Sequence, residues 1–358
     1  YSSVSGTYKG IVKRMHNSLR PQNHMVIECD FKQTKVQSFA PLDWQSASRE
    51  ECVDFVKNAG IVGLGGAGFP TYVKYMKPDG VDYVLINAVE CEPYITADYR
   101  SVMDDAQDLV TGAKIMKKMA EAKTVYICIK ESHPDLIEKV KSALNDAAGV
   151  EVRPVPDVYP MGWERVLVRE VLHKEYGGLP AEAGAIIGNA SSAIAIAKAF
   201  EKGEAITQKN LTVSGECVKD PHNVCVPVGM PVSEIIEACG GYTQDTVRLI
   251  SGGPMMGKTI VNDMFVVDRA MNALTVLPAA NDDAIACLRC GKCSDHCPSG
   301  LQPVRITAAL KANDVDEMSK RGVMSCIECG MCTYICPSHI DVTENVRKAK
   351  RIVMLKKK

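Results

Sequence analysis

The segment CIECGMCTYICP at residues 326–337 has the same cysteine and proline spacing as CLRCGKCSDHCP at 287–298. Both fit C-x2-C-x2-C-x3-C-P, the run that holds cubane iron–sulfur clusters in bacterial ferredoxins. A pair of structural zinc sites is the alternative, because C-x2-C pairs also bind zinc. A zinc site has no use for a third C-x2 step followed by C-P. The spacing therefore predicts two [4Fe–4S] clusters.

The cluster ligands are expected in two crossed sets, because the fourth cysteine of each run ligates the other cluster in two-cluster ferredoxins. One set is Cys287, Cys290, Cys293 and Cys336, and the other is Cys326, Cys329, Cys332 and Cys297. The sequence predicts two short helices between the cassettes (303–322) and one more after them (341–358), capped by Asp341 or Thr343.

The whole chain bounds the class of protein. Its 358 residues suffice for two or three domains, and 42 lysines and arginines nearly balance 43 acidic residues. We therefore exclude nucleic acid as the default partner. The sequence contains no run of eighteen apolar residues, so we predict no transmembrane segment in it. Cysteines outside the cassettes are scattered singly, which favours a reducing, cytoplasmic location. The opening YSSVSGTYKGIVKRM begins in mid-pattern without a methionine, so we expect a preceding N-terminal piece.

Clusters of this kind pass single electrons, whereas NADH gives up a hydride, and a flavin links the two. The sequence GLGGAGFPT at 63–71 is the candidate flavin loop. Its glycines, Gly63, Gly65, Gly66 and Gly68, remove side chains where a backbone must approach a ring or a phosphate. Lys74 follows and could reach a phosphate. A plain glycine-rich turn is the alternative.

An apolar strand, DYVLIN at 82–87, leads directly into polar residues. Asn87, Glu90 and Glu92 follow it, and open α/β sheets bind ligands at the carboxyl ends of their strands. Solvated surface glutamates are the alternative. Further along the chain, 124–130 and 150–156 are strand-like, 101–121 and 133–147 are helix-like, and 159–172 is a turn entering a helix near Glu164. The alternation predicts a mostly parallel sheet with flanking helices.

Five segments together with both cassettes resemble the C subunit of the Rnf ferredoxin:NAD oxidoreductase. They are GLGGAGFPT, INAVECEPYITADYR, YPMGWE, GLPAEAGAIIGNAS and SGGPMMG. The resemblance extends to soluble relatives, namely the electron-transfer protein of proline reductase and the cobalamin reductase of propanediol-degrading organelles. Residues 63–100 and 159–164 resemble, more distantly, the NADH- and FMN-binding subunit of respiratory complex I.

The resemblance implies FMN on the glycine loop and NADH stacked over it. The residues implied to hold the FMN phosphate and ribityl chain are Gly63, Gly65, Gly66 and Lys74, and those implied to touch or enclose the flavin are Asn87, Asn189, Tyr159 and Gly162. Phe69, Glu92 and Glu164 are implied to face the nicotinamide nucleotide. The sequence departs from complex I at Leu64, Val89 and Trp163, where complex I has an arginine, an aspartate and a glutamate.

The expected fold is α/β and has four parts, which the resemblance supplies. They are the end of a lipoyl-like β-barrel (1–43), a Rossmann-like FMN/NADH-binding domain (44–205), a β-grasp, soluble-ligand-binding-like module with a linker (206–280), and an α-helical ferredoxin-like domain with two clusters (281–358). The partial barrel has no lysine in a lipoylation turn, so no carrier function is predicted.

The segment GGPMMGKT at 252–259 satisfies the P-loop pattern G-x4-G-K-T. A P-loop must open a helix whose first amides bind the phosphate. The following IVNDMFVVDR is β-branched and alternating, which predicts a strand. We therefore reject a nucleotide-hydrolysing function.

The leading hypothesis is an NADH-dependent oxidoreductase that passes electrons through FMN and two [4Fe–4S] clusters to a protein partner. The partner is either a set of Rnf subunits, with peripheral association at the cytoplasmic face of the membrane, or a soluble reductase such as proline reductase, which YPMGWE favours. The alternatives are a non-catalytic adaptor fed by ferredoxin or flavodoxin, a cobalamin reductase-like role, and a zinc-stapled scaffold.

Overall fold

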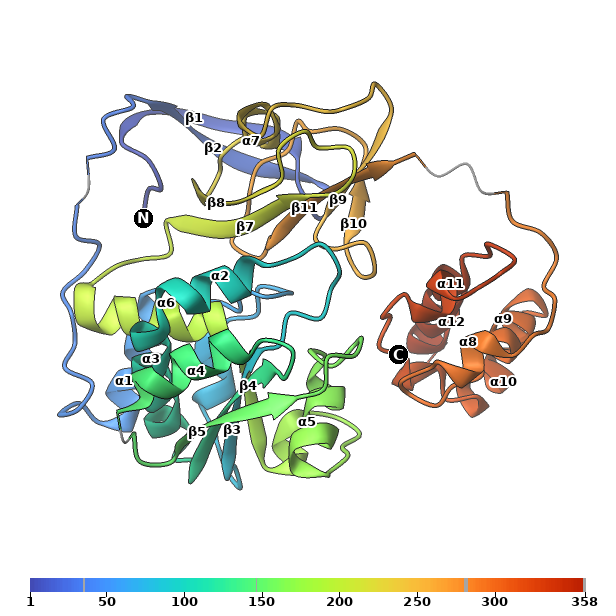
Figure 1. Ribbon diagram of the computed structural model, residues 1–358, viewed down its shortest axis with the longest axis horizontal. Coiled ribbons are helices and arrows are strands. Elements are labelled where there is room, and N and C mark those ends of the chain that lie inside the picture. The colour runs from blue at the N-terminus through green and yellow to red at the C-terminus, as the bar shows by residue number, and fades with distance from the viewer. Residues whose placement is uncertain (35, 146, 280–282, 357–358) are drawn as a thin grey trace. The chain divides into compact units, whose positions relative to one another are not determined.

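The computed structural model describes residues 1–34, 36–145, 147–279 and 283–356 (Figure 1). The chain divides into two compact units, residues 1–253 with 258–278, and residues 254–257 with 279–358. The expected boundary between 280 and 281 lies outside the described residues.

The first unit contains a four-stranded parallel sheet in the order β5-β4-β3-β6. Its strands are β3 (Tyr83–Ala88), β4 (Thr124–Lys130), β5 (Val150–Val155) and β6 (Ala185–Asn189). Strands β3, β4 and β6 are mainly apolar because both faces of the sheet are covered there, and Val84, Leu85 and Ile86 of β3 are fully buried. The edge strand β5 alternates instead, with Glu151 and Arg153 between its valines. The parallel sheet predicted from the alternation is confirmed.

Helices flank this sheet, and Figure 1 shows α5 on the opposite side from α1, α3, α4 and α6. They are α1 (Arg49–Asn58), η1 (Thr71–Tyr75), α2 (Ala97–Asp104), α3 (Ala106–Ala120), α4 (Pro134–Leu144), α5 (Glu164–Leu172), η2 (Pro180–Ala183) and α6 (Ala190–Lys202). Apolar faces of α1, α3, α4 and α6 pack with the sheet in one core cluster.

Residues 101–121, expected to be helix-like, are helical except for a break at Asp105 and the terminal Glu121. Asp105 has non-helical dihedral angles (φ −116°, ψ 35°) and ends α2 while it starts α3. Its carboxylate lies 2.6 Å from Lys198 Nζ on α6. The break therefore follows from a tertiary ion pair together with a residue type that is a poor helix former.

A second, five-stranded sheet follows in the order β10-β9-β11-β7-β8. It comprises β7 (Gln208–Ser214), β8 (His222–Pro227), β9 (Val247–Ser251), β10 (Lys258–Ile260) and β11 (Ala273–Pro278), and α7 (Val232–Ala238) packs into its core. Strand β10 begins at the lysine of GGPMMGKT and pairs antiparallel with β9. The strand predicted over IVNDMFVVDR is wrong beyond Ile260, the last residue of β10, because residues 261–270 form turns, bends and one isolated bridge. No helix begins in these residues either, so the helix that a P-loop requires does not follow the segment.

The N-terminal residues form a two-stranded antiparallel sheet of β1 (Gly6–Met15) and β2 (Pro21–Cys29). Most of its side chains are exposed. Whether this hairpin completes a lipoyl-like barrel stays a prediction.

The second unit is helical. It contains α8 (Lys292–Asp295), α9 (Pro303–Lys311), α10 (Val315–Lys320), η3 (Val323–Ser325), α11 (Met331–Tyr334) and α12 (Val342–Lys356). The two helices predicted between the cassettes are confirmed as α9 and α10. Asp341 Oδ1 accepts the amide of Glu344 at 3.1 Å, which is the predicted cap of α12. Within the described residues, the search for a helix both long and apolar enough to cross a membrane finds none.

Candidate functional site

The carboxyl ends of β3 and β6 form the topological switch point of the parallel sheet. From β3 the chain moves outward through β4 to β5 and then returns to β6 on the other side of β3. The loops that leave β3 and β6 therefore diverge, and such a point is where open α/β sheets bind ligands. Asn87 and Asn189 are register partners at this point.

The glycine loop lies against this switch point. Gly63 N–H donates to Phe69 O at 2.9 Å and closes the loop. A β-carbon on Gly65 would lie 2.4 Å from Asn189 Nδ2, so only glycine fits there. A β-carbon on Gly66 would meet no heavy atom within 4 Å. Gly65 thus allows close packing against Asn189, whereas the backbone at Gly66 has open space beside it.

The peptide unit of Leu64 is held from both sides. Its N–H donates to Ser192 Oγ on α6 at 2.9 Å, and its carbonyl accepts from Lys209 Nζ on β7 at 2.9 Å. Lys209 is 4% exposed, and burial lowers the pKa of its ammonium group. The second sheet therefore contributes directly to the position of the glycine loop.

Lys74 and Glu164 lie together beside β6. Lys74 Nζ donates to Ile187 O on β6 at 2.8 Å and lies 3.4 Å from Glu164 Oε1. Glu164 is the first residue of α5, where the helix dipole favours an anion. Because the ion pair is partly exposed, it is worth at most about 1 kcal/mol. A phosphate could therefore compete with Glu164 for Lys74.

The turn before α5 packs on the end of β3. Asn87 Nδ2 donates to Gly162 O at 2.7 Å, and Asn87 Oδ1 accepts the amide of Val89 at 3.0 Å. Gly162 N–H donates to Cys91 Sγ at 3.3 Å. Burial raises the pKa of the Cys91 thiol to about 11, which keeps it neutral. Tyr159 stands in the same turn and precedes a cis peptide bond to Pro160.

The acidic residues Glu90 and Asp98 connect the loop after β3, the start of α2 and the end of β6. The two carboxylate oxygens of Glu90 accept the amides of Asp98 at 2.8 Å and Tyr99 at 3.0 Å, at the start of α2. Asp98 in turn accepts Asn189 Nδ2 at 2.7 Å and Ser191 Oγ at 2.6 Å. Burial and the neighbouring Asp98 raise the pKa of Glu90 to about 7. Both oxygens of Glu90 are thus engaged by α2.

The loop after β9 approaches the same region. A β-carbon on Gly253 would lie 2.3 Å from Glu92 Oε2. The glycine in SGGPMMG therefore lets the backbone pass close to Glu92, which is a predicted site residue. Phe69, predicted to face nicotinamide, is about half exposed.

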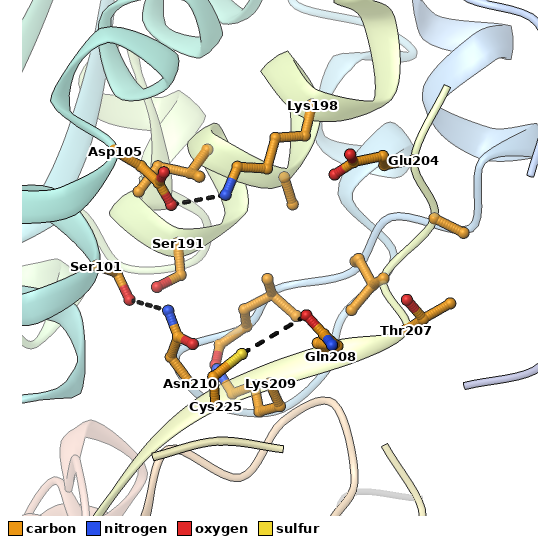
Figure 2. A pocket seen from close by; sticks show the side chains of 15 residues that line it. Ser101, Asp105, Ser191, Lys198, Glu204, Thr207, Gln208, Lys209, Asn210 and Cys225 are labelled. Carbon is orange, nitrogen blue, oxygen red and sulfur yellow. Dashed lines mark hydrogen bonds and ion pairs between the residues drawn. The ribbon is translucent and has the colours of Figure 1, made fainter. Parts of the chain in front are cut away.

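A cavity of about 160 Å³ adjoins the held Leu64 peptide and is lined by none of the predicted cofactor residues (Figure 2). Leu64 and Lys209 are among its lining residues. Figure 2 shows Lys198 extended toward Asp105, which forms the ion pair already described, and Asn210 donating to Ser101 Oγ at 2.9 Å. Because its polar side chains are largely paired with one another, we assign no ligand to this cavity.

In the helical unit, four cysteines line one small cavity. They are Cys297 of the first cassette and Cys326, Cys329 and Cys332 of the second. These are the four cysteines of one predicted crossed set. The remaining lining is mainly apolar and includes Leu301, Ile327 and Val346. The donor set therefore suits a group that binds several thiolates in a dry environment.

The protonation of these thiols depends on their burial. Burial raises the pKa of Cys326 and Cys329, and raises that of Cys332 to about 11. Such thiols become thiolates when iron supplies compensating positive charge. Among the described residues, no three histidine, cysteine or acidic side chains converge tightly enough for a single metal ion. Thiolates of a cubane bind separate iron atoms, so they need not be that close.

Comparison with known proteins gives three domain matches. The Nuo51 FMN-binding domain matches residues 56–198, the SLBB domain matches 210–259, and the 4Fe-4S dicluster domain matches 279–337.

Curated relatives match across the domains. The chain is 35% identical to the C subunit of the proton-translocating ferredoxin:NAD(+) oxidoreductase complex of Clostridium ljungdahlii, over 85% of this chain and 68% of that protein. It is also 35% identical to the C subunit of the Na(+)-translocating complex of Acetobacterium woodii, over 100% of this chain and 83% of that protein. The chain belongs to the family of Rnf C subunits.

Other members of this family are longer than the matched region. The C subunit of the ion-translocating oxidoreductase complex of Rhodobacter capsulatus is 37% identical, over 78% of this chain but 56% of that protein. Among solved structures, an NAD+-reducing [NiFe]-hydrogenase in the H2-reduced state matches with a TM-score of 0.57 and 15% identity, over 89% of this chain and 64% of that chain. That likeness supports the fold.

As a member of this family, the chain has an FMN-binding domain and a 4Fe-4S dicluster domain. The structure brings together most of the predicted flavin residues, namely Gly65, Lys74, Asn87, Gly162 and Asn189. Glu164, predicted to face the nicotinamide nucleotide, lies beside Lys74. Sequence reasoning missed Asp98, Ser192 and Lys209. The serine follows the helix-capping Asn189 and could have been noticed, but a buried lysine at the start of a strand leaves no signal in one sequence.

Proposed function

We propose that this chain transfers electrons between NADH and a protein partner through FMN and two [4Fe–4S] clusters. The observation that carries the proposal is that one chain holds both a glycine loop at a sheet switch point and a cavity lined by cysteines of two cassettes. FMN supplies the exchange between hydride and single electrons, and the protein supplies binding and orientation.

The glycine loop would hold FMN through its backbone. Gly66 has open space at its β-carbon position, so a flat ring or a phosphate can approach the main chain there. Lys74 would supply the positive charge for the phosphate by releasing Glu164, from which its Nζ stands 3.4 Å. Glu164 would then be free to meet a nicotinamide nucleotide.

The two asparagines at the strand ends would fix the flavin pocket. Asn189 is held because its Oδ1 accepts the amide of Ser191 at 2.9 Å while its Nδ2 donates to Asp98 at 2.7 Å. Asn87 is held by Gly162 and Val89. Side chains held in this way keep their orientation without loss of entropy when a ligand binds. The remaining residues assigned to this site are Gly63, Gly65, Gly68, Phe69, Glu90, Glu92 and Tyr159.

The eight cassette cysteines would hold the clusters in the crossed sets. One cluster would lie on Cys297, Cys326, Cys329 and Cys332, which line a common cavity. The other would lie on Cys287, Cys290, Cys293 and Cys336. Cys287 and Cys290 are exposed. The second cluster would therefore be the one nearer to solvent.

An anaerobic titration of the FMN- and cluster-loaded chain with NADH tests this function. Absorbance would follow the flavin and electron paramagnetic resonance (EPR) would follow the clusters. Flavin bleaching followed by signals from reduced clusters is expected. NADH that leaves both groups oxidised, in protein shown to contain them, would refute the proposal.

An adaptor fed by ferredoxin or flavodoxin is the second candidate. Val89 favours it, because this position is fully buried and offers no carboxylate where complex I has an aspartate. Deuterated NADH discriminates between the two candidates. The oxidoreductase is expected to remove deuterium from NADH and release it into water, whereas an adaptor would leave the deuterated NADH unchanged.

The proposed partners are proteins that accept or donate single electrons. They are the other subunits of an Rnf-type complex, with this chain peripheral to the membrane, or a soluble reductase such as proline reductase. A cobalamin reductase-like role belongs to the same proposal. The N-terminal hairpin would be the end of a lipoyl-like barrel, and residues 206–280 would be a β-grasp module and linker between the flavin domain and the ferredoxin-like domain.

A further inference from the structure

The helical unit is an internal repeat with matching backbone geometry. Cys287 and Cys326 are 39 positions apart, as are Cys297 and Cys336. Arg289 and Glu328 both have φ of 56°, and the glycines two residues later have φ of 81° and 79°. Each cassette then forms a four-residue helix, α8 or α11. Equivalent positions in the two halves can therefore be compared directly.

In the second half of the repeat, a threonine hydroxyl lies next to a cysteine that is predicted to bind a cluster. Cys332 Sγ lies 3.3 Å from Thr343 Oγ1, and Thr343 is 6% exposed. Thr333 Oγ1 accepts the amide of Thr343 at 2.8 Å, and its single proton lies within reach of Thr343 Oγ1 at 2.8 Å and of Asp341 Oδ1 at 3.2 Å. A thiolate bound to iron can only accept a hydrogen bond. The Thr343 hydroxyl must therefore donate to Cys332.

The other half cannot make this bond. The position 39 residues before Thr343 is Val304, on α9, and the cysteine equivalent to Cys332 is Cys293. Valine has the shape of threonine but no donor. The two predicted clusters thus differ in one buried hydrogen bond to a ligand sulfur.

Charges near the cassettes also differ between the two halves. Glu328 is paired with Arg347 at 2.8 Å and with Lys350 at 3.1 Å, and Lys350 Nζ donates to Cys326 O at 2.7 Å. The equivalent position of Glu328 is Arg289, which is exposed and therefore screened by solvent. The hydroxyl difference is the one that can be exchanged between the halves without changing charge.

We propose that Thr343 is a positioning residue that raises the reduction potential of the cluster held by Cys297, Cys326, Cys329 and Cys332. The proposal rests on the proposed function only in taking these cysteines as ligands. Reduction adds negative charge that falls partly on the ligand sulfurs, so a donor to Cys332 stabilises the reduced state more than the oxidised one. Val304 leaves the other cluster without this contribution.

Redox titration of the loaded chain followed by EPR tests the proposal, with iron and sulfide measured in each variant. Thr343→Val is expected to make one cluster harder to reduce by up to about tenfold, which corresponds to about 59 mV for a one-electron couple. The midpoint of the other cluster is expected to stay unchanged. Thr343→Ser, which keeps the hydroxyl, is expected to retain the wild-type midpoint.

The reciprocal variant, Val304→Thr, is expected to raise the midpoint of the other cluster. It keeps the test decisive if Thr343→Val loads iron poorly. Unchanged midpoints in fully loaded Thr343→Val, or in fully loaded Val304→Thr, would overturn the proposal, as would an equal shift of both clusters in either variant. Dithionite can drive this titration without NADH. A chain that NADH does not reduce would therefore contradict the proposed function, while the effect of Thr343 on the cluster potential could still be measured.

Discussion

Replacing Gly66 with alanine separates cofactor binding from folding at the glycine loop. No heavy atom lies within 4 Å of the β-carbon that alanine would add, and Gly66 does not have the positive φ that disfavours alanine. The free energy of unfolding of the cofactor-free chain is therefore expected to change by less than about 0.5 kcal/mol. If FMN lies against this backbone, the alanine methyl group occupies space that FMN needs. The affinity for FMN is then expected to fall at least about tenfold, or about 1.4 kcal/mol.

Gly65→Ala is the matched control one residue earlier. Its β-carbon would lie 2.4 Å from Asn189 Nδ2 and 2.8 Å from Asn189 Cγ. Asn189 cannot move aside without losing its cap of α6 and its bond to Asp98. A cap is worth about 0.5–2 kcal/mol and a hydrogen bond to a charged group about 1.5–3 kcal/mol. This variant is expected to lose about 2–4 kcal/mol of stability as well as FMN.

Two assays on each variant distinguish these outcomes. Urea unfolding of the cofactor-free chain measures stability, and quenching of FMN fluorescence measures affinity. The reasoning about Gly66 is refuted if Gly66→Ala binds FMN as the wild type does. It is equally refuted if the cofactor-free Gly66→Ala variant is destabilised as much as Gly65→Ala.

Three further predictions concern buried groups. Lys209→Met removes the amine that bonds to the glycine loop, so the dissociation constant for FMN, measured by fluorescence, is expected to rise about tenfold while the chain stays folded. Because the pKa of Glu90 is raised from 4.5 to about 7, the folded chain keeps a proton that the unfolded chain has lost. The stability from that proton is full below about pH 4.5 and is lost as the pH rises through 7, so Glu90→Gln is expected to flatten this decline, by up to about 1.4 kcal/mol per pH unit, in urea unfolding. Cys297→Ser is expected to remove the same EPR signal as Cys332→Ser, with about half the iron retained, whereas Cys336→Ser removes the other signal.

Each of these predictions has a contradicting result. Unchanged FMN affinity in Lys209→Met would mean that other contacts, such as that from Ser192, suffice to hold the loop. An unaltered pH profile in Glu90→Gln would assign the titration to another group. Loss of different signals in Cys297→Ser and Cys332→Ser would mean that each cassette serves its own cluster.

Much of the local structure could be predicted because it depends on neighbours in sequence. Strands β3 and β4 can be predicted to within a residue or so because they are nearly continuous apolar runs, and β5 because its valines alternate with Glu151 and Arg153. The cap of α12 by Asp341 follows from the chemistry of one side chain. The break of the expected 101–121 helix at Asp105 could not be predicted, because its ion pair with Lys198 joins positions far apart in the chain.

By itself, the sequence determined which residue types are available to bind cofactors and how they are spaced along the chain. The eight cassette cysteines and the run of glycines can be read directly from neighbouring positions. Only the tertiary structure decided which residues meet. It lined one cavity with Cys297 and three cysteines of the other cassette, and it placed Lys209 of the second sheet under the glycine loop. It also placed the Thr343 hydroxyl beside Cys332, whereas the equivalent position in the first half of the repeat is Val304. Such contacts depend on packing between distant segments, which a linear pattern does not encode.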